Sequence, residues 1–109
     1  MDLDDYQRGA LRTAASRDKK NELLHLVLGL VGESGEIAEK FKKWVRDCDS
    51  DESRLDRAGI AKELGDVLWY VATLADYLDL SLDDIAAANL AKLASRQNRG
   101  VLSGSGDDR

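Results

Sequence analysis

Apolar side chains recur at three- and four-residue intervals along most of the chain, and this spacing predicts amphipathic helices. The pattern places helices at about residues 3–14, 22–46, 54–78 and 81–98. No alternating strand pattern competes with them, and proline is absent. Four helices with short connections predict an all-α fold of the four-helix-bundle type.

The segments between these helices are polar. Asp18–Asn21 is expected to break the first helix from the second, and Asp47–Ser53 is expected to link the second to the third. Ser81 followed by Asp84 resembles a capping box and is expected to start the fourth helix. Residues 98–109 form a glycine-rich tail, and its part Gly100–Arg109 cannot be a regular helix.

The length of 109 residues fits a single domain spanning 1–109. A chain of this size buries a limited core, so we expect oligomerisation to complete the fold.

Two acidic pairs lie at helical spacing, each beside an apolar face: Glu33 with Glu36, and Glu63 with Asp66. An isolated pair of this kind is usually a solvated helix surface. Four carboxylates converging from two helices would repel one another, and a divalent cation would relieve that repulsion. Because the ligands are hard oxygens without histidine or cysteine, Mg²⁺ fits best, with Mn²⁺ as a substitute.

A third polar stripe lies on the fourth predicted helix, where Asn89, Lys92 and Arg96 follow the same three- and four-residue spacing. Lysine offers a point charge, and arginine a planar fork for phosphate oxygens. Acidic groups for a metal and basic groups for a phosphate, on neighbouring helices, are typical of a phosphoryl-transfer site.

The overall charge narrows the choice of partners. A formal net charge of −5 argues against a non-specific nucleic-acid binder, which needs a basic face. No apolar run is long enough to span a membrane, and the acidic N-terminus lacks the features of a signal peptide. The single cysteine, Cys48, cannot form an internal disulfide. We therefore expect a cytoplasmic protein without nucleic-acid or membrane partners.

The context of these stripes resembles the all-α nucleoside triphosphate pyrophosphohydrolases of the MazG-like superfamily. Their E-x-x-E signature matches GLVGESGEIAEKFKK, and their E-x-x-D signature matches KELGDVLWYVATLADYL. Between Glu36 and Glu63 lie 26 residues, towards the long end of the family's gap. NLAKLASR is similar to the family's N-x-x-K-x-x-x-R element, and the resemblance extends over about residues 6–109.

The resemblance implies a magnesium-dependent reaction in which NTP or dNTP and water give NMP or dNMP and pyrophosphate. It implies that Glu33, Glu36, Glu63 and Asp66 bind the metal and carry the catalysis. It also implies a homodimer or homotetramer, and a role in removing noncanonical nucleotides. The residues expected to contact substrate are Asn89, Lys92, Arg96 and Tyr70, followed by Lys40, Gln7 and Arg109.

Three of the last four residues, Tyr70, Lys40 and Arg109, also have a structural interpretation. Tyr70 is either an aromatic near the nucleotide or a tyrosine at the edge of the core. Lys40 either reaches a phosphate or, as we favour, pairs with Glu36 at i,i+4. Gln7, in the YQRGALRTA start, is expected to touch base or sugar. The tail that carries Arg109 either approaches a phosphate of a neighbouring site or frays.

Two other functions remain open from the sequence, and a third is discounted. Phosphoribosyl-ATP pyrophosphatase shares the chemistry but differs in substrate. A non-catalytic helical interaction module would need neither metal nor nucleotide. A ferritin-like di-iron protein needs two E-x-x-H pairs, whereas this chain has one, formed by Glu22 and His25.

Overall fold

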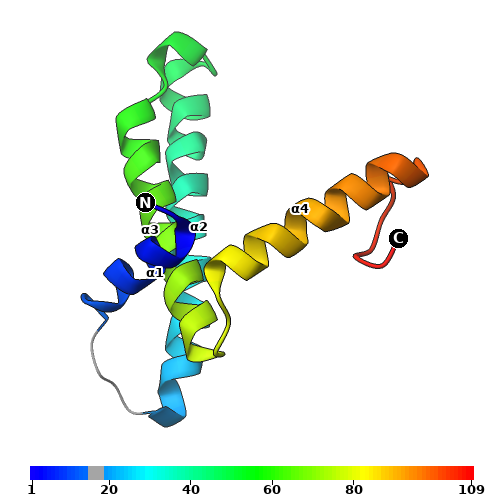
Figure 1. The fold of residues 1–109 in the computed structure, drawn as a ribbon. Helices are drawn as coiled ribbons and strands as arrows, with labels where there is room; N and C mark the ends of the chain where they lie inside the picture. The colour runs from blue at the N-terminus through cyan, green and yellow to red at the C-terminus, as the bar shows by residue number, and fades with distance from the viewer. Residues whose placement is uncertain (15–18) are drawn as a thin grey trace.

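The computed structural model describes residues 1–14 and 19–109, and its regular elements are helices (Figure 1). Their bounds are α1 Leu3–Leu11, α2 Lys19–Cys48, a 3-10 turn Glu52–Arg54, α3 Arg57–Tyr77 and α4 Leu82–Arg99. Residues 1–14 and 19–109 contain no β-strand. The predicted all-α class is therefore confirmed.

Helices α2 and α3 form an antiparallel pair, side by side in Figure 1. Lys40 lies against Asp56 near the end where the chain turns, and Gly29 lies against Tyr70 farther along. Residues earlier in α2 therefore contact residues later in α3, as in an antiparallel pair. This pairing aligns the acidic segment of α2 with that of α3.

Local sequence signals explain where the helices begin and end. Ser81 caps α4 as predicted, because its hydroxyl oxygen accepts from the Asp84 amide at 3.2 Å. Gly100 ends α4 with a left-handed φ of 71°, which favours glycine. The break expected at Asp18–Asn21 is wrong for residues 19–21, which already belong to α2, and Asp18 lies outside the described residues.

The buried amide of Gln7 joins α1 to the turn between α3 and α4. Its Nε2 donates to the carbonyl oxygens of Ala72 at 3.1 Å and Leu80 at 3.0 Å. Its Oε1 accepts from the Leu82 amide at 3.2 Å. Both ends of the Gln7 amide are thus occupied by backbone groups, and one of them is the buried Leu82 amide in the first turn of α4, which has no partner within its own helix.

Helix α4 leaves the other three helices after its first turns (Figure 1). Its start is anchored to α1, where the Asp4 carboxylate accepts from the Ser81 hydroxyl at 2.8 Å and the Asp83 amide at 3.1 Å. The radius of gyration is 17.0 Å. A compact chain of about this length would have a radius near 13 Å. The four helices therefore do not close into a bundle within one chain.

This open shape leaves apolar side chains in solvent. Leu24, Leu28 and Val31 follow one stripe of α2 and are 58%, 60% and 64% exposed. Leu64 on α3 and Leu90 on α4 are also more than half exposed. Their periodicity predicts a buried face, and a single chain does not provide the surface that would cover it.

Within the described residues, no helix combines the length and apolar character needed to cross a membrane.

We expect Gln7→Leu to lower the free energy of unfolding by about 2 kcal/mol, because it removes three hydrogen bonds and leaves the buried Leu82 amide without a partner. Urea unfolding at fixed protein concentration would measure this loss. Arg8→Leu, at the exposed neighbouring position, should change it by less than about 0.5 kcal/mol. A Gln7→Leu protein of undiminished stability would show that these hydrogen bonds do not support the fold.

Candidate active site

Three of the four predicted metal ligands converge between α2 and α3. One carboxylate oxygen each from Glu33, Glu63 and Asp66 lies within 4.8 Å of the other two. Glu36 lies one turn beyond Glu33, is exposed, and stays outside this cluster. The antiparallel pairing therefore brings the two acidic segments together, as helical spacing predicts.

The cluster is electrostatically uncompensated within the described part of the chain, where no lysine or arginine forms an ion pair with its three carboxylates. Partial burial raises the pKa of Glu33, and the negative charges of Asp66, Glu63 and Glu36 raise it further. Asp66 also contributes, after burial, to the raised pKa of Tyr6. An oxygen-only cluster that resists further negative charge fits a hard divalent cation.

A recess of about 350 Å³ adjoins the cluster, lined by Thr13, Glu33, Asp66, Trp69 and Tyr70. A neighbouring cavity of about 140 Å³ shares Thr13, Trp69 and Tyr70 and extends between α2 and α3 towards His25 and Asp76. Aromatic walls suit a flat, polar-edged ligand, and a cation held by the neighbouring carboxylates would allow that ligand to carry an anionic group.

The position of Tyr70 depends on Gly29. A Cβ added at Gly29 would lie 2.1 Å from Cε1 of the Tyr70 ring, so the ring occupies the space that a side chain would take. Trp69 meets the Tyr70 ring edge-on, with centroids 5.0 Å apart. Tyr70 therefore lies at the recess, and its position is compatible with both predicted interpretations.

Trp69 and Thr13 were not among the predicted site residues. The Trp69 indole nitrogen donates to Thr13 Oγ1 at 2.9 Å and to the Ala10 carbonyl at 3.2 Å. This contact holds the end of α1 over the recess. The sequence carries no signal for it, because Thr13 lies 56 residues from Trp69.

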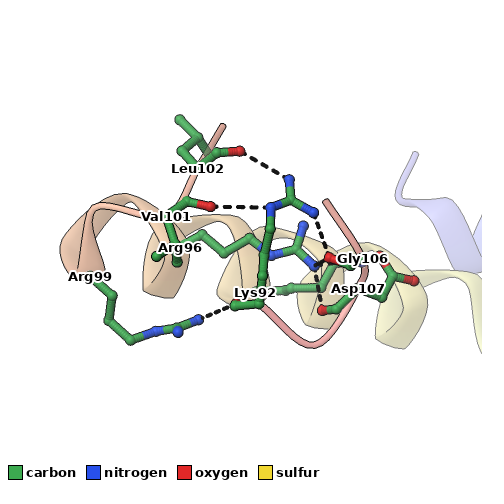
Figure 2. A network of polar contacts seen from close by, with 8 residues as sticks. Lys92, Arg96, Arg99, Val101, Leu102, Gly106 and Asp107 are labelled. Carbon is green, nitrogen blue, oxygen red and sulfur yellow. Dashed lines mark hydrogen bonds and ion pairs between the residues drawn. The ribbon is translucent and has the colours of Figure 1, made fainter. Parts of the chain in front are cut away.

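The basic stripe lies apart from the acidic cluster. Lys92 and Arg96 belong to the half of α4 that extends away from α2 and α3 in Figure 1, and Asn89 is exposed on the same helix. Instead, both basic side chains contact the tail of their own chain at Asp107 (Figure 2). The expected meeting of acidic and basic stripes on neighbouring helices does not occur within one chain.

Three further residues predicted to contact substrate, Lys40, Gln7 and Arg109, instead contact other groups of their own chain. The preferred pairing of Lys40 with Glu36 is wrong, since Lys40 Nζ lies 3.8 Å from Asp56 Oδ2. The Gln7 amide is occupied by backbone groups, so its geometry does not support a contact with base or sugar. The Arg109 guanidinium donates to three carbonyl oxygens of the tail.

Comparison with known families agrees with this arrangement. The family profile described as MazG nucleotide pyrophosphohydrolase domain matches residues 21–101, which include both acidic segments and the basic stripe. The chain belongs to the MazG nucleotide pyrophosphohydrolase family. It is accordingly a hydrolase of the nucleotide pyrophosphohydrolase class, and the predicted family resemblance is confirmed.

Relatives of this MazG chain fall into two groups. It is 46% identical over 114 residues to the Gene 37 protein of Mycobacterium phage L5, and the match covers 100% of both chains. It is 35% identical to dCTP pyrophosphatase 1 of Homo sapiens and 33% identical to that of Rattus norvegicus, each over 102 residues. These matches cover 89% of this chain and 58% of the mammalian proteins. No solved structure matches the chain.

We expect magnesium to raise the melting temperature at pH 7 and Glu33→Gln to abolish that shift. The mutation should also raise the melting temperature of the metal-free protein at pH 7, because it removes one of the mutually repelling charges. Thermal melts with and without magnesium would measure both effects. Glu39→Gln on the same helix, which loses a surface pair with Lys42, is the matched control.

The pH dependence has a definite sign. The folded protein holds the Glu33 proton more tightly than the unfolded chain does, because its folded pKa lies above the ordinary value of 4.5. This contribution to stability is complete below that value and is lost as the pH rises through the raised pKa. Metal-free wild type should therefore lose stability over this window relative to Glu33→Gln. Parallel curves for the two proteins would contradict the assignment.

Proposed function

We propose that this protein is a magnesium-dependent nucleoside triphosphate pyrophosphohydrolase, with manganese as a substitute. The reaction is NTP or dNTP plus water giving NMP or dNMP plus pyrophosphate. The observation that carries the proposal is the convergence of Glu33, Glu63 and Asp66 beside an aromatic recess. A role in clearing noncanonical nucleotides fits this reaction, because the product monophosphate can no longer be polymerised.

The carboxylates have distinct tasks in the proposed reaction. Glu33, Glu63 and Asp66 hold the cation, and the exposed Glu36, whose charge acts on Glu33, completes the metal-binding set. Bound magnesium would neutralise phosphate charge and lower the pKa of a bound water. One of the four carboxylates orients the attacking water. The bond that breaks joins the α-phosphorus to the oxygen bridging to the β-phosphate.

The recess and its neighbouring cavity suit the nucleoside part of the substrate. Tyr70 and Trp69 offer aromatic surface next to the acidic cluster, and the cavity volume of about 140 Å³ suits a single base. The mammalian relatives are named for dCTP. We therefore propose dCTP as the first substrate to test, within a panel that includes the other deoxynucleotides and phosphoribosyl-ATP.

A second copy of the chain is the proposed partner. The exposed stripe of Leu24, Leu28 and Val31 offers apolar surface that a homodimer or homotetramer would bury. Such an assembly would also let the basic stripe of one copy, with Lys92 and Arg96, approach the acidic cluster of another. This arrangement would supply the phosphate contacts that a single chain keeps apart from its carboxylates.

Purified protein with magnesium should convert dCTP into dCMP and pyrophosphate, resolved by ion-exchange chromatography. Glu63→Gln and Asp66→Asn should each lower kcat by about 100-fold or more, because each removes a metal ligand. Circular dichroism should show unchanged helical content. Release of dCDP and phosphate, or full turnover in excess EDTA, would refute the proposal.

Sedimentation velocity should show wild-type protein at two or four times the chain mass of 12.0 kDa. Leu28→Glu should dissociate it, because a charge would then lie in the proposed apolar interface. Leu102→Glu is the matched control, since Leu102 is exposed in the tail, away from that stripe. A wild type that sediments as a monomer would show that the exposed stripe has another role.

A further inference from the structure

The tail after α4 folds back onto the helix that precedes it (Figures 1 and 2). The turn begins at Gly100, and a second positive φ, of 84°, occurs at Gly106. Asp107 then lies against Lys92 and Arg96, fifteen and eleven residues earlier in the chain. These are the two basic side chains assigned above to phosphate binding.

One carboxylate oxygen of Asp107 joins both basic side chains. Asp107 Oδ1 lies 3.2 Å from Lys92 Nζ and 3.4 Å from Arg96 Nη2. The same Nη2 donates to the carbonyl oxygens of Asp107 and Gly106. The Asp107 side chain is 84% exposed, whereas that of Arg96 is 4% exposed. The exposed Asp107 carboxylate therefore contacts the buried Arg96 guanidinium.

The guanidinium edge of Arg96 is only partly used by the tail. The contacts of the tail fall on Nη2, while Arg96 Nε is buried without a hydrogen-bond partner. Phosphate groups bind arginine through two parallel hydrogen bonds, which need two donors on one edge of the fork. Asp107 leaves one of those donors unsatisfied, so the resting arrangement falls short of what a phosphate can make there.

The loop itself is held by other bonds. The Arg109 guanidinium donates to the carbonyl oxygens of Val101 at 3.1 Å, Leu102 at 2.9 Å and Gly106 at 2.6 Å. Arg99 Nη2 donates to the Arg109 carbonyl at 2.8 Å. None of these bonds uses the Asp107 carboxylate. The charge of Asp107 can therefore be removed while the remaining contacts of the loop stay in place.

We propose that the Asp107 carboxylate is an internal occupant of the Lys92–Arg96 phosphate site, which a phosphate group of the substrate must displace. Carboxylate and phosphate oxygens accept from the same donors, and an ion pair whose carboxylate is exposed to solvent is weak enough to be displaced. The low pKa of Asp107, caused first by the Lys92 hydrogen bond and charge, keeps this occupant ionised at neutral pH. The inference rests on the proposed function, whose site it regulates.

Titration calorimetry of the full chain with inorganic pyrophosphate, without added metal, tests the proposal. We expect Asp107→Asn to bind pyrophosphate about two- to fivefold more tightly than wild type, because the competing charge is gone. Asp108→Asn is the matched control, since it removes the same charge from the adjacent tail position. Its effect should stay below about 1.5-fold at physiological ionic strength.

A second variant separates competition from a change in loop structure. Lys92→Gln combined with Asp107→Asn should lose the gain in affinity, because the released donor is then absent. In steady-state assays with dCTP, Asp107→Asn should lower KM and leave kcat unchanged. Unchanged or weaker pyrophosphate binding by Asp107→Asn, or equal gains for Asp107→Asn and Asp108→Asn, would overturn the inference.

The two proposals fail in different ways. If no nucleotide is hydrolysed but Asp107→Asn still tightens pyrophosphate binding, the proposed function is wrong and the internal occupant stands. If dCTP is hydrolysed and Asp107→Asn behaves like Asp108→Asn, the function stands and the internal occupant is wrong.

Discussion

The antiparallel packing of α2 on α3 is the contact on which the site depends, because it holds like charges together. Glu33 on α2 and Glu63 with Asp66 on α3 would separate if the helices were free to slide. Apolar packing along the pair, and the seat of the Tyr70 ring on Gly29, fix the register against this repulsion. Burial, followed by this repulsion, raises the pKa of Glu33, and a bound cation would offset the repulsion.

The other two helices, α1 and α4, are attached to this pair to different extents. Helix α1 is tied to this pair by the Gln7 amide and the Trp69 indole. The Gln7 amide bonds backbone groups only, whereas the Trp69 indole donates to the Ala10 carbonyl and the Thr13 hydroxyl. Helix α4 is anchored mainly at its start, so its basic residues are carried away from the acidic cluster. A rigid acidic half and an outlying basic half thus coexist in one small chain. Each half presents groups that the other lacks.

Helix positions and the acidic cluster follow from local rules, and so they could be predicted from sequence. Periodicity identifies which face of a helix is apolar, which placed Glu33, Glu63 and Asp66 beside a core. It cannot say which partner covers that face, so the departure of α4 was not foreseen. Lys40 was paired with its helical neighbour, whereas the turn into α3 brings Asp56 to it. Tertiary contacts of this kind depend on residues that are distant in sequence.

The close contact between Gly29 and Tyr70 has a consequence for redesign of the recess. Because the ring rests where a Cβ would stand, the backbone of α2 at Gly29 limits how far the Tyr70 ring can move towards that helix. A tyrosine can retreat from a larger ligand by rotating, but a helix backbone cannot. Enlarging the recess towards α2 therefore requires a smaller residue at position 70, while a substitution at position 29 can only narrow it.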